Sequence, residues 1–213
     1  MPITFKNIRI AAVFSFVFFI CFICVLFFSS SCSREIKNIS TETVFKDGET
    51  GILANNGAVD FYFYYPENWG IHRNDLMITV YVNDPKTLES NLTEGVSESP
   101  LAFMTVPNIS AQVFSLLEGY ETIDDYWIYF AAPSFRQIFD EVSDEAEDEL
   151  VVDGAPAKKY TYSISLSGMD YKISQIVFLK NRRVYTITYT AISEKYDTYA
   201  NVLDNAAETF KFK

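Results

Sequence analysis

Cysteine is confined to the start of this chain. The sequence has three cysteines, Cys21, Cys24 and Cys32, within its 213 residues. Residues 33–213 therefore hold no disulfide framework, no cysteine-based zinc site and no cysteine nucleophile. Histidine is just as scarce, because His72 is the only one. A single histidine excludes a multi-histidine metal site. It also leaves His72 as the one residue that could act as the base of a Ser-His-Asp triad. We expect His72 to be a surface or turn residue.

Motifs of enzyme chemistry are missing as well. The sequence contains no G-x-S-x-G, no phosphate-binding Walker loop and no G-x-G-x-x-G. We therefore expect no catalytic residue, no cofactor-binding residue and no metal ligand, and the chain is predicted not to be an enzyme.

Basic residues are also scarce relative to acidic ones. The 28 Asp and Glu outnumber the 17 Lys and Arg, which gives a formal net charge of −11. An acidic chain argues against nucleic acid as a partner, because that binding needs Lys and Arg to neutralise phosphates. It argues against direct binding to anionic lipid for the same reason.

Part of the excess acid is local, since seven Asp and Glu lie within residues 140–149. We interpret this run as a solvated loop that keeps the protein soluble. A site for a cation or for a basic partner remains the open alternative, although the spacing does not match the D-x-D-x-D-G calcium loop.

Apolar residues, in contrast, are concentrated near the N-terminus. Lys6 and Arg9 precede an uncharged run at 10–28, which is followed by three serines and Cys32. A positive start, an apolar run and small residues at a cleavage site are typical of a secretory signal. The cysteine directly after the small residues resembles a bacterial lipoprotein signal, in which the cysteine is acylated and becomes the mature N-terminus. The family usually has Leu three positions before the cysteine, where this chain has Ser29.

The leader leaves one alternative open, an uncleaved membrane anchor. A helix of 19 residues spans about 28 Å, close to the hydrocarbon thickness of a bilayer. With either a cleaved signal or an uncleaved anchor, the rest of the chain should be exported, because the cations before the apolar run stay on the cytoplasmic side of the membrane. We predict a bacterial lipoprotein on the extracytoplasmic face of the cell membrane, held by palmitate-type acyl chains on Cys32, since two chains anchor stably. The expected parts are a signal peptide or anchor (1–31), a tether and lead-in (32–57) and a globular domain (58–213).

Three strands in a meander are predicted at 158–166, 171–180 and 184–191, where β-branched and aromatic residues alternate with polar ones. The middle strand is apolar on both faces, so both sides of the sheet should be covered. Composition and flanking turn residues indicate further strands at 43–45, 59–65, 76–82, 101–106 and 210–212.

Two helices are predicted, at 123–139 and 194–209. Thr122 can cap the first, and Pro133 should kink or split it. The second carries a regular apolar stripe that includes Leu203 and Ala206. Two separate helices and an antiparallel sheet indicate an α+β sandwich.

Short motifs in this chain resemble those of PsbP-like proteins. Residues 65–69 (YPENW) resemble the Y-P-x-x-W opening of that family, and residues 154–160 (GAPAKKY) resemble its G-x-P-A-x-x-Y entry to the meander. The segments 185–189 and 209–212 match as well. The resemblance implies the Mog1/PsbP fold, an α/β/α sandwich with a central antiparallel sheet flanked by two main helices. In bacteria such domains often follow lipoprotein signals, but no family site residue can be transferred by matching.

Three functions remain compatible with the sequence. The first is a non-enzymatic extracytoplasmic lipoprotein that binds a protein or assists assembly at the membrane. The second is a lipoprotein that binds a small ligand or glycan in a groove lined by tyrosines, although these tyrosines are more readily explained as half-buried residues under the helices. The third is a carboxylate hydrolase. The tyrosines near the strands are Tyr62, Tyr64, Tyr65, Tyr160, Tyr162 and Tyr171, and the candidate carboxylates are Asp60, Glu67, Asp153 and Asp170.

Overall fold

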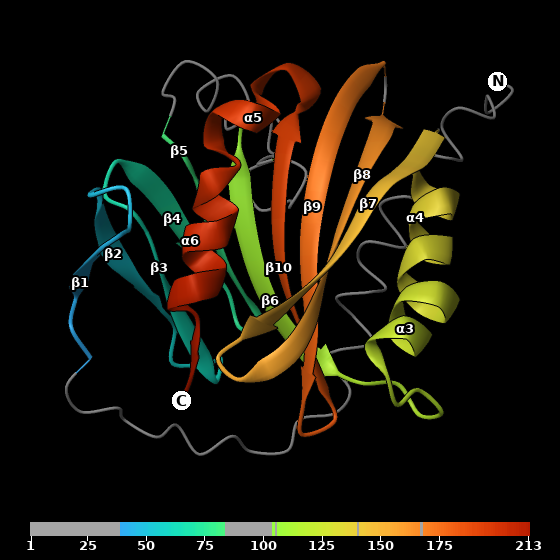
Figure 1. The fold of residues 1–213 in the computed structure, drawn as a ribbon, viewed down its shortest axis with the longest axis horizontal. Helices are drawn as coiled ribbons and strands as arrows, with labels where there is room; N and C mark the ends of the chain where they lie inside the picture. Colours follow the sequence, from blue (N-terminus) through green and yellow to red (C-terminus); the bar gives the residue numbers. More distant parts are fainter. Residues whose placement is uncertain (1–38, 84–103, 105, 140, 167) are drawn as a thin grey trace, which may run out of the picture. The chain divides into compact units, whose positions relative to one another are not determined.

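All described residues belong to one compact unit, Ser33–Lys213. Within it, the computed structural model describes residues 39–83, 104, 106–139, 141–166 and 168–213 (Figure 1). The leader at 1–31, Cys32 and the first residues of the expected tether lie outside this part. No helix in the described ranges is both long enough and apolar enough to cross a membrane.

A sheet of seven antiparallel strands forms the centre of the fold, in the order β4-β5-β6-β10-β9-β8-β7 (Figure 1). Its strands are β4 (Trp69–Arg73), β5 (Met77–Val82), β6 (Asn108–Ser115), β7 (Glu141–Val152), β8 (Ala155–Leu166), β9 (Met169–Lys180) and β10 (Arg183–Ile192). The meander β8-β9-β10 confirms the prediction from alternation.

A smaller antiparallel sheet has the order β1-β2-β3-β11. Its strands are β1 (Glu42–Val44), β2 (Thr50–Asn55), β3 (Phe61–Pro66) and β11 (Lys211–Phe212), the last of which confirms the short strand expected near residue 211. Strand β2 pairs with β3 from Gly51 opposite Pro66 to Asn55 opposite Tyr62. The sheet therefore includes residues that precede the expected domain start at 58.

Helices lie on both faces of the larger sheet. The first helical segment consists of α3 (Ile123–Tyr126), the π-helical η3 (Trp127–Ala131) and α4 (Ala132–Ile138). The second consists of η4 (Ser193–Lys195), α5 (Tyr196–Tyr199) and α6 (Asn201–Thr209). Residues of α6 and of the smaller sheet pack on one face, and residues of α3 and η3 pack on the other. The fold is thus the predicted α+β arrangement, an α/β/α sandwich.

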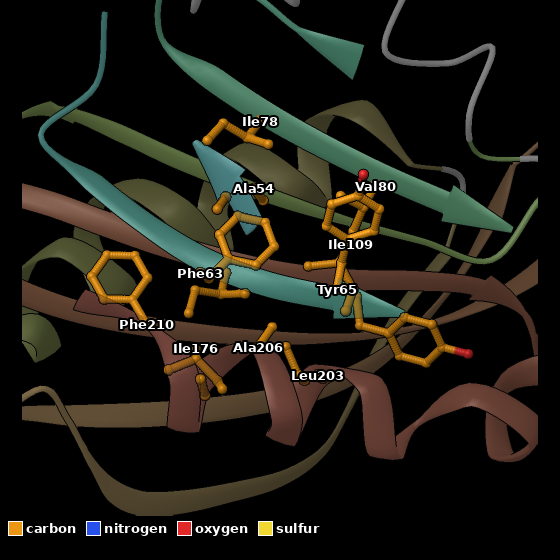
Figure 2. Close-up of a cluster of buried hydrophobic side chains, with 14 of the residues drawn as sticks. Ala54, Phe63, Tyr65, Ile78, Val80, Ile109, Ile176, Leu203, Ala206 and Phe210 are labelled. Carbon is orange, nitrogen blue, oxygen red and sulfur yellow. The ribbon is translucent and has the colours of Figure 1, made fainter. Parts of the chain in front are cut away.

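The α6-side core joins both sheets to helix α6. Figure 2 shows side chains from these elements converging on one another. Its buried residues include Ala54, Phe61, Phe63, Tyr65, Trp69, Ile78, Val80, Ile109, Ile176, Phe178, Tyr185, Leu203, Ala206 and Phe210. The predicted stripe of the second helix, with Leu203 and Ala206, faces this core as expected.

The α3-side core fills the opposite face of the larger sheet and is richer in tyrosine. Its buried residues are Tyr126, Ala131, Tyr160, Tyr162, Ile164, Tyr171, Ile173, Val177 and Val184, with Trp127, Phe130 and Phe135 among the partly buried residues packed against them. Successive residues of β9 alternate between the two cores, because side chains of a strand point to opposite faces.

The prediction of a loop at 140–149 is wrong for most of that run, which belongs to β7, an edge strand of the larger sheet. Asp148 lies opposite Lys159 and Glu149 lies opposite Lys158 on β8, and such opposite charges stabilise antiparallel pairs. Acidic side chains on an edge strand also discourage pairing with another chain.

The predicted strand at 101–106 lies mostly outside the described part, and its two described residues, Met104 and Val106, are not in a strand. Val106 lies in a bend and β6 begins at Asn108, while residues 101–103 and 105 fall outside the described part. None of the expected strands covers β4, which only Glu67 and Asn68 separate from β3.

Candidate functional site

The first helical segment starts at a capping box. Thr122 Oγ1 accepts a hydrogen bond from the Asp125 N–H at 3.0 Å, and Asp125 Oδ2 accepts from the Thr122 N–H at 2.9 Å. Asp125 Oδ2 also accepts from the Glu121 N–H. The backbone N–H groups of Glu121 and Thr122 hold the pKa of Asp125 below its ordinary value of 3.8. The predicted cap at Thr122 is therefore confirmed, and it fixes the point where the helix leaves the preceding loop.

Pro133 has the predicted disruptive effect, and a π-helical turn is the result. A proline lacks an N–H, and its ring clashes with the carbonyl four residues earlier, which here is that of Tyr129. The turn before it widens, so that the Ala132 N–H donates to the Trp127 carbonyl five residues back. Ser134 Oγ donates to the Phe130 carbonyl at 2.6 Å. The wider turn places one more residue in each turn than an α-helix does.

One side of this segment is fixed to the sheet. The Trp127 ring stacks on the Tyr160 ring of β8, with centroids 3.7 Å apart and planes within 2°. Beside it, Lys158 Nζ donates to Asp124 at 2.6 Å and to Glu147 at 2.8 Å. These hydrogen bonds, the one to Asp124 first, raise the pKa of Lys158. Helix, β8 and β7 are thus tied together by a stacked pair and a shared cation.

The other side of the segment exposes apolar side chains. Ile128 and Tyr129 are 55% and 65% exposed, and Leu117 in the preceding loop is 40% exposed. The Tyr120 ring stacks on the Tyr129 ring with centroids 6.5 Å apart, which brings the loop against the helix. We call Leu117, Tyr120, Ile128 and Tyr129 the 117–129 surface.

Two contacts link the residues of this surface, the Tyr120–Tyr129 stack and a hydrogen bond from the Tyr120 N–H to the Leu117 carbonyl at 3.3 Å. Three of the six exposed large hydrophobic side chains in the described part of the chain belong to it, and the other three lie on β1, β7 and β9. Single exposed apolar residues are normal, whereas neighbouring ones mark binding surfaces. The sequence signal was the unbroken apolar run at 126–130 (YWIYF), because five consecutive apolar residues are distributed around a helix and exceed the width of one buried stripe.

The tyrosines near the strands are core residues. This agrees with their interpretation as residues packed under the helices. Five of the six have at most 9% of their surface exposed, and Tyr62 is partly exposed. They are Tyr64, Tyr65, Tyr160, Tyr162 and Tyr171. Buried rings do not line an open groove for a peptide or glycan.

The four candidate carboxylates make separate contacts. Asp60 accepts from Tyr185 Oη at 2.9 Å and from Arg183, and Asp170 accepts from Ser165. Glu67 is exposed in the turn between β3 and β4. None of the contacts described for these groups joins two of the four.

Asp153 is held as an anion at the turn between β7 and β8. Burial opposes its ionisation, but hydrogen bonds from Lys211 Nζ at 2.7 Å and from the Phe212 N–H at 3.0 Å outweigh burial. The pKa of Asp153 is therefore below its ordinary value of 3.8. A carboxylate with a lowered pKa attaches the last strand to the sheet and is unsuited to act as an acid at neutral pH.

A cavity of about 250 Å³ lies beside helix α5. It is smaller than the range of roughly 300–1,000 Å³ that is usual for ligand pockets. Its lining contains one aromatic residue among Val82, Val106, Pro107, Lys195, Thr198 and Tyr199.

His72 lies in strand β4 with its side chain partly exposed. Among the side chains that the structure describes, no group of three or more His, Cys, Asp or Glu is placed to hold a metal ion.

No protein-family model and no curated protein matches the sequence. Solved structures do match. LpqN of Mycobacterium tuberculosis, involved in cell envelope biogenesis, is 11% identical, with 81% of this chain and 90% of LpqN covered at a TM-score of 0.51. The Ran-binding protein Mog1p of Saccharomyces cerevisiae is 6% identical, with 77% and 96% covered at a TM-score of 0.52.

Cyanobacterial PsbP (CyanoP) of Synechocystis is 12% identical, with 86% and 98% covered at a TM-score of 0.49. The matches to LpqN and Mog1p confirm the Mog1/PsbP-like fold implied by the sequence motifs. Likeness at such low identity shows the fold alone, and function depends on sites that differ between proteins of one fold.

Proposed function

We propose that this protein is a non-enzymatic extracytoplasmic lipoprotein, anchored through Cys32, that binds a protein partner through the 117–129 surface. The observation that carries the proposal is the cluster of exposed apolar side chains on a helical segment whose opposite side is fixed to the sheet. Tyrosine is among the residues enriched at interface centres, where large apolar contacts exclude water around it.

The placement of these residues supports binding in a second way. Trp127 and the capping box hold the backbone of the segment, so the exposed side chains are already positioned before a partner arrives. A surface fixed in advance loses less entropy on binding. π-helical turns, in addition, occur frequently at functional sites.

Two proteins of the same fold have roles of a compatible kind. LpqN is involved in cell envelope biogenesis, and Mog1p binds Ran. Anchoring at the cell surface is supported by the leader, in which the cations, the apolar run and the serines precede Cys32 as in lipoprotein signals.

Anchoring is tested by substituting cysteines in the full chain. We expect mass spectrometry to find an acyl group on the wild-type N-terminal cysteine, and Cys32→Ala should abolish it. Cys24→Ala, a change in the same leader, should leave acylation intact. A full-length wild-type chain in the soluble fraction without an acyl group would contradict the anchoring proposal.

Partner binding is tested by photo-crosslinking in cells that make the full chain. A benzoylphenylalanine replaces Tyr129 in one variant and Val44 in a control, because Val44 is similarly exposed, at 71%, on the smaller sheet. We expect a defined protein adduct at position 129 and not at position 44. Equal adducts at both positions, or adducts with lipid alone, would contradict the proposed binding of a protein partner.

Small-ligand binding is the second candidate, and the cavity beside α5 is the observation in its favour. Because this cavity is small and contains a single aromatic residue, small-ligand binding is the weaker of the two candidate functions.

A further inference from the structure

The loop and helix that carry the 117–129 surface are strongly acidic. Residues 117–129 contain four acids, Glu118, Glu121, Asp124 and Asp125, and no Lys or Arg. The side chains of Glu118, Glu121 and Asp124 are exposed, as is that of Arg182, whose carbonyl accepts a hydrogen bond from the Leu116 N–H at 2.9 Å. Acids therefore outnumber this neighbouring cation around the apolar residues.

The acidic surroundings continue onto the neighbouring edge strand. Lys158 is shared by Asp124 of α3 and Glu147 of β7, so one cation serves two carboxylates. Glu149, two residues further along β7 and opposite Lys158, is an exposed acid on the same face of the sheet as Glu147.

From this combination we infer that the 117–129 surface docks a cationic amphipathic segment of a protein partner. Apolar side chains of that segment cover Leu117, Ile128 and Tyr129, and its Lys or Arg side chains face Glu118 and Glu121. Amphipathic segments are recognised in this way by an apolar surface with charge of the opposite sign around it. The inference rests on the proposed protein-binding function and adds the chemistry of the partner.

The same charges disfavour the other occupants of an exposed apolar surface. A symmetric dimer would place this surface against its own copy, and Glu118 and Glu121 would face identical acids. Anionic lipid headgroups attract basic segments and repel an acidic one.

The test uses the full chain in nanodiscs of zwitterionic lipid, with benzoylphenylalanine at position 129 or at the control position 44. Three synthetic peptides of one length are compared. The first has Leu and Lys at helical spacing, the second has Leu and Glu at the same spacing, and the third has Ser and Lys. Irradiation with each peptide is followed by quantification of the adduct.

We expect the Leu/Lys peptide to give at least about tenfold more adduct at position 129 than either other peptide. Added salt should lower that yield, because exposed charges are screened. Glu118→Lys combined with Glu121→Lys should lower it about tenfold, since like charges across an interface are repulsive. The matched control, Glu67→Lys with Glu194→Lys, makes the same change in net charge at exposed sites outside the surface and should leave the yield unchanged.

Equal adducts with the Leu/Glu peptide, equal adducts at position 44, or the same loss in both charge-reversal variants would overturn the inference. In cells, a protein adduct at position 129 whose crosslinked segment is neutral or acidic would also overturn it, while leaving the proposed protein binding intact. Failure of the proposed function looks different, because no protein adduct forms there at all.

Discussion

The two faces of the larger sheet are covered in different ways. On the α6 side, residues of both sheets and helix α6 enclose a core in which Phe61, Phe63 and Phe178 are fully buried. On the α3 side, tyrosines are packed under a single helical segment, and several of its aromatic residues remain partly buried. The first face therefore contributes mainly stability, whereas the second also presents side chains to solvent.

Each face contains one of the two tryptophans, which allows the faces to be followed separately. Trp69 is buried in the α6-side core, and Trp127 packs on the α3-side core. Trp127→Phe leaves a reporter of the first face, and Trp69→Phe leaves a reporter of the second.

The largest effect is expected from Phe178→Ala in the α6-side core. The Phe178 ring stacks on Tyr185 at 5.5 Å and meets Phe210 edge-on at 5.0 Å. Removing it leaves a cavity and should lower the free energy of unfolding by about 3–5 kcal/mol. Urea denaturation followed by Trp69 fluorescence, with Trp127→Phe alone as the control, measures this loss. A loss below about 1 kcal/mol would show that this core adapts far more easily than close packing allows.

A smaller effect is expected from Thr122→Ala, which removes the cap of the α3 segment. The Asp125 N–H loses its side-chain acceptor, and the free energy of unfolding should fall by about 1 kcal/mol. Denaturation followed by Trp127 fluorescence checks this change. Thr122→Ser retains the hydroxyl and should behave like the parent; if Ser and Ala were equally destabilising, the cap would not be the cause.

A still smaller effect concerns pH and the last strand. The folded-state pKa of Asp153 is lowered, so its stabilising contribution is present above about pH 4 and is lost as pH falls through the folded value. Asp153→Asn should lower the free energy of unfolding at pH 7 by about 0.5 kcal/mol, because the ion pair with Lys211 is partly exposed. The same variant should show a weaker loss of stability below pH 4 than the parent does. A steeper loss than in the parent would mean that folding raises the pKa of Asp153 and does not lower it.

The smallest effect on stability is expected at the 117–129 surface itself. Ile128→Ser combined with Tyr129→Ser removes exposed apolar groups, and such surface changes usually stay within about 0.5 kcal/mol. Denaturation followed by Trp127 fluorescence measures it. A loss of several kcal/mol would assign these residues to the core.

Regular alternation made much of the larger sheet predictable from sequence. β8, β9 and β10 combine period-two patterns with β-branched and aromatic residues, and tight turns separate them. β7 was missed because Asp and Glu are unfavourable in strands when considered alone. Its pairing with Lys158 and Lys159 is apparent only once the register is known.

The candidate surface was less predictable than the fold. An α-helical stripe correctly assigns Trp127 and Phe130 to the side that faces the sheet. The positions of Ile128 and Tyr129 depend on the π-helical turn before Pro133, and on a loop that returns Tyr120 to the helix. Neither feature follows from local spacing, because both depend on how the segment packs on β8.

The most direct test pairs binding with stability in one variant. Benzoylphenylalanine at Leu117 is irradiated in cells making the full chain, with and without Ile128→Ser and Tyr129→Ser, and the same chains are unfolded in urea. We predict that the double substitution lowers the protein adduct at least about tenfold while the free energy of unfolding stays within about 0.5 kcal/mol. An undiminished adduct in a chain of unchanged stability would contradict the assignment of this surface to partner binding.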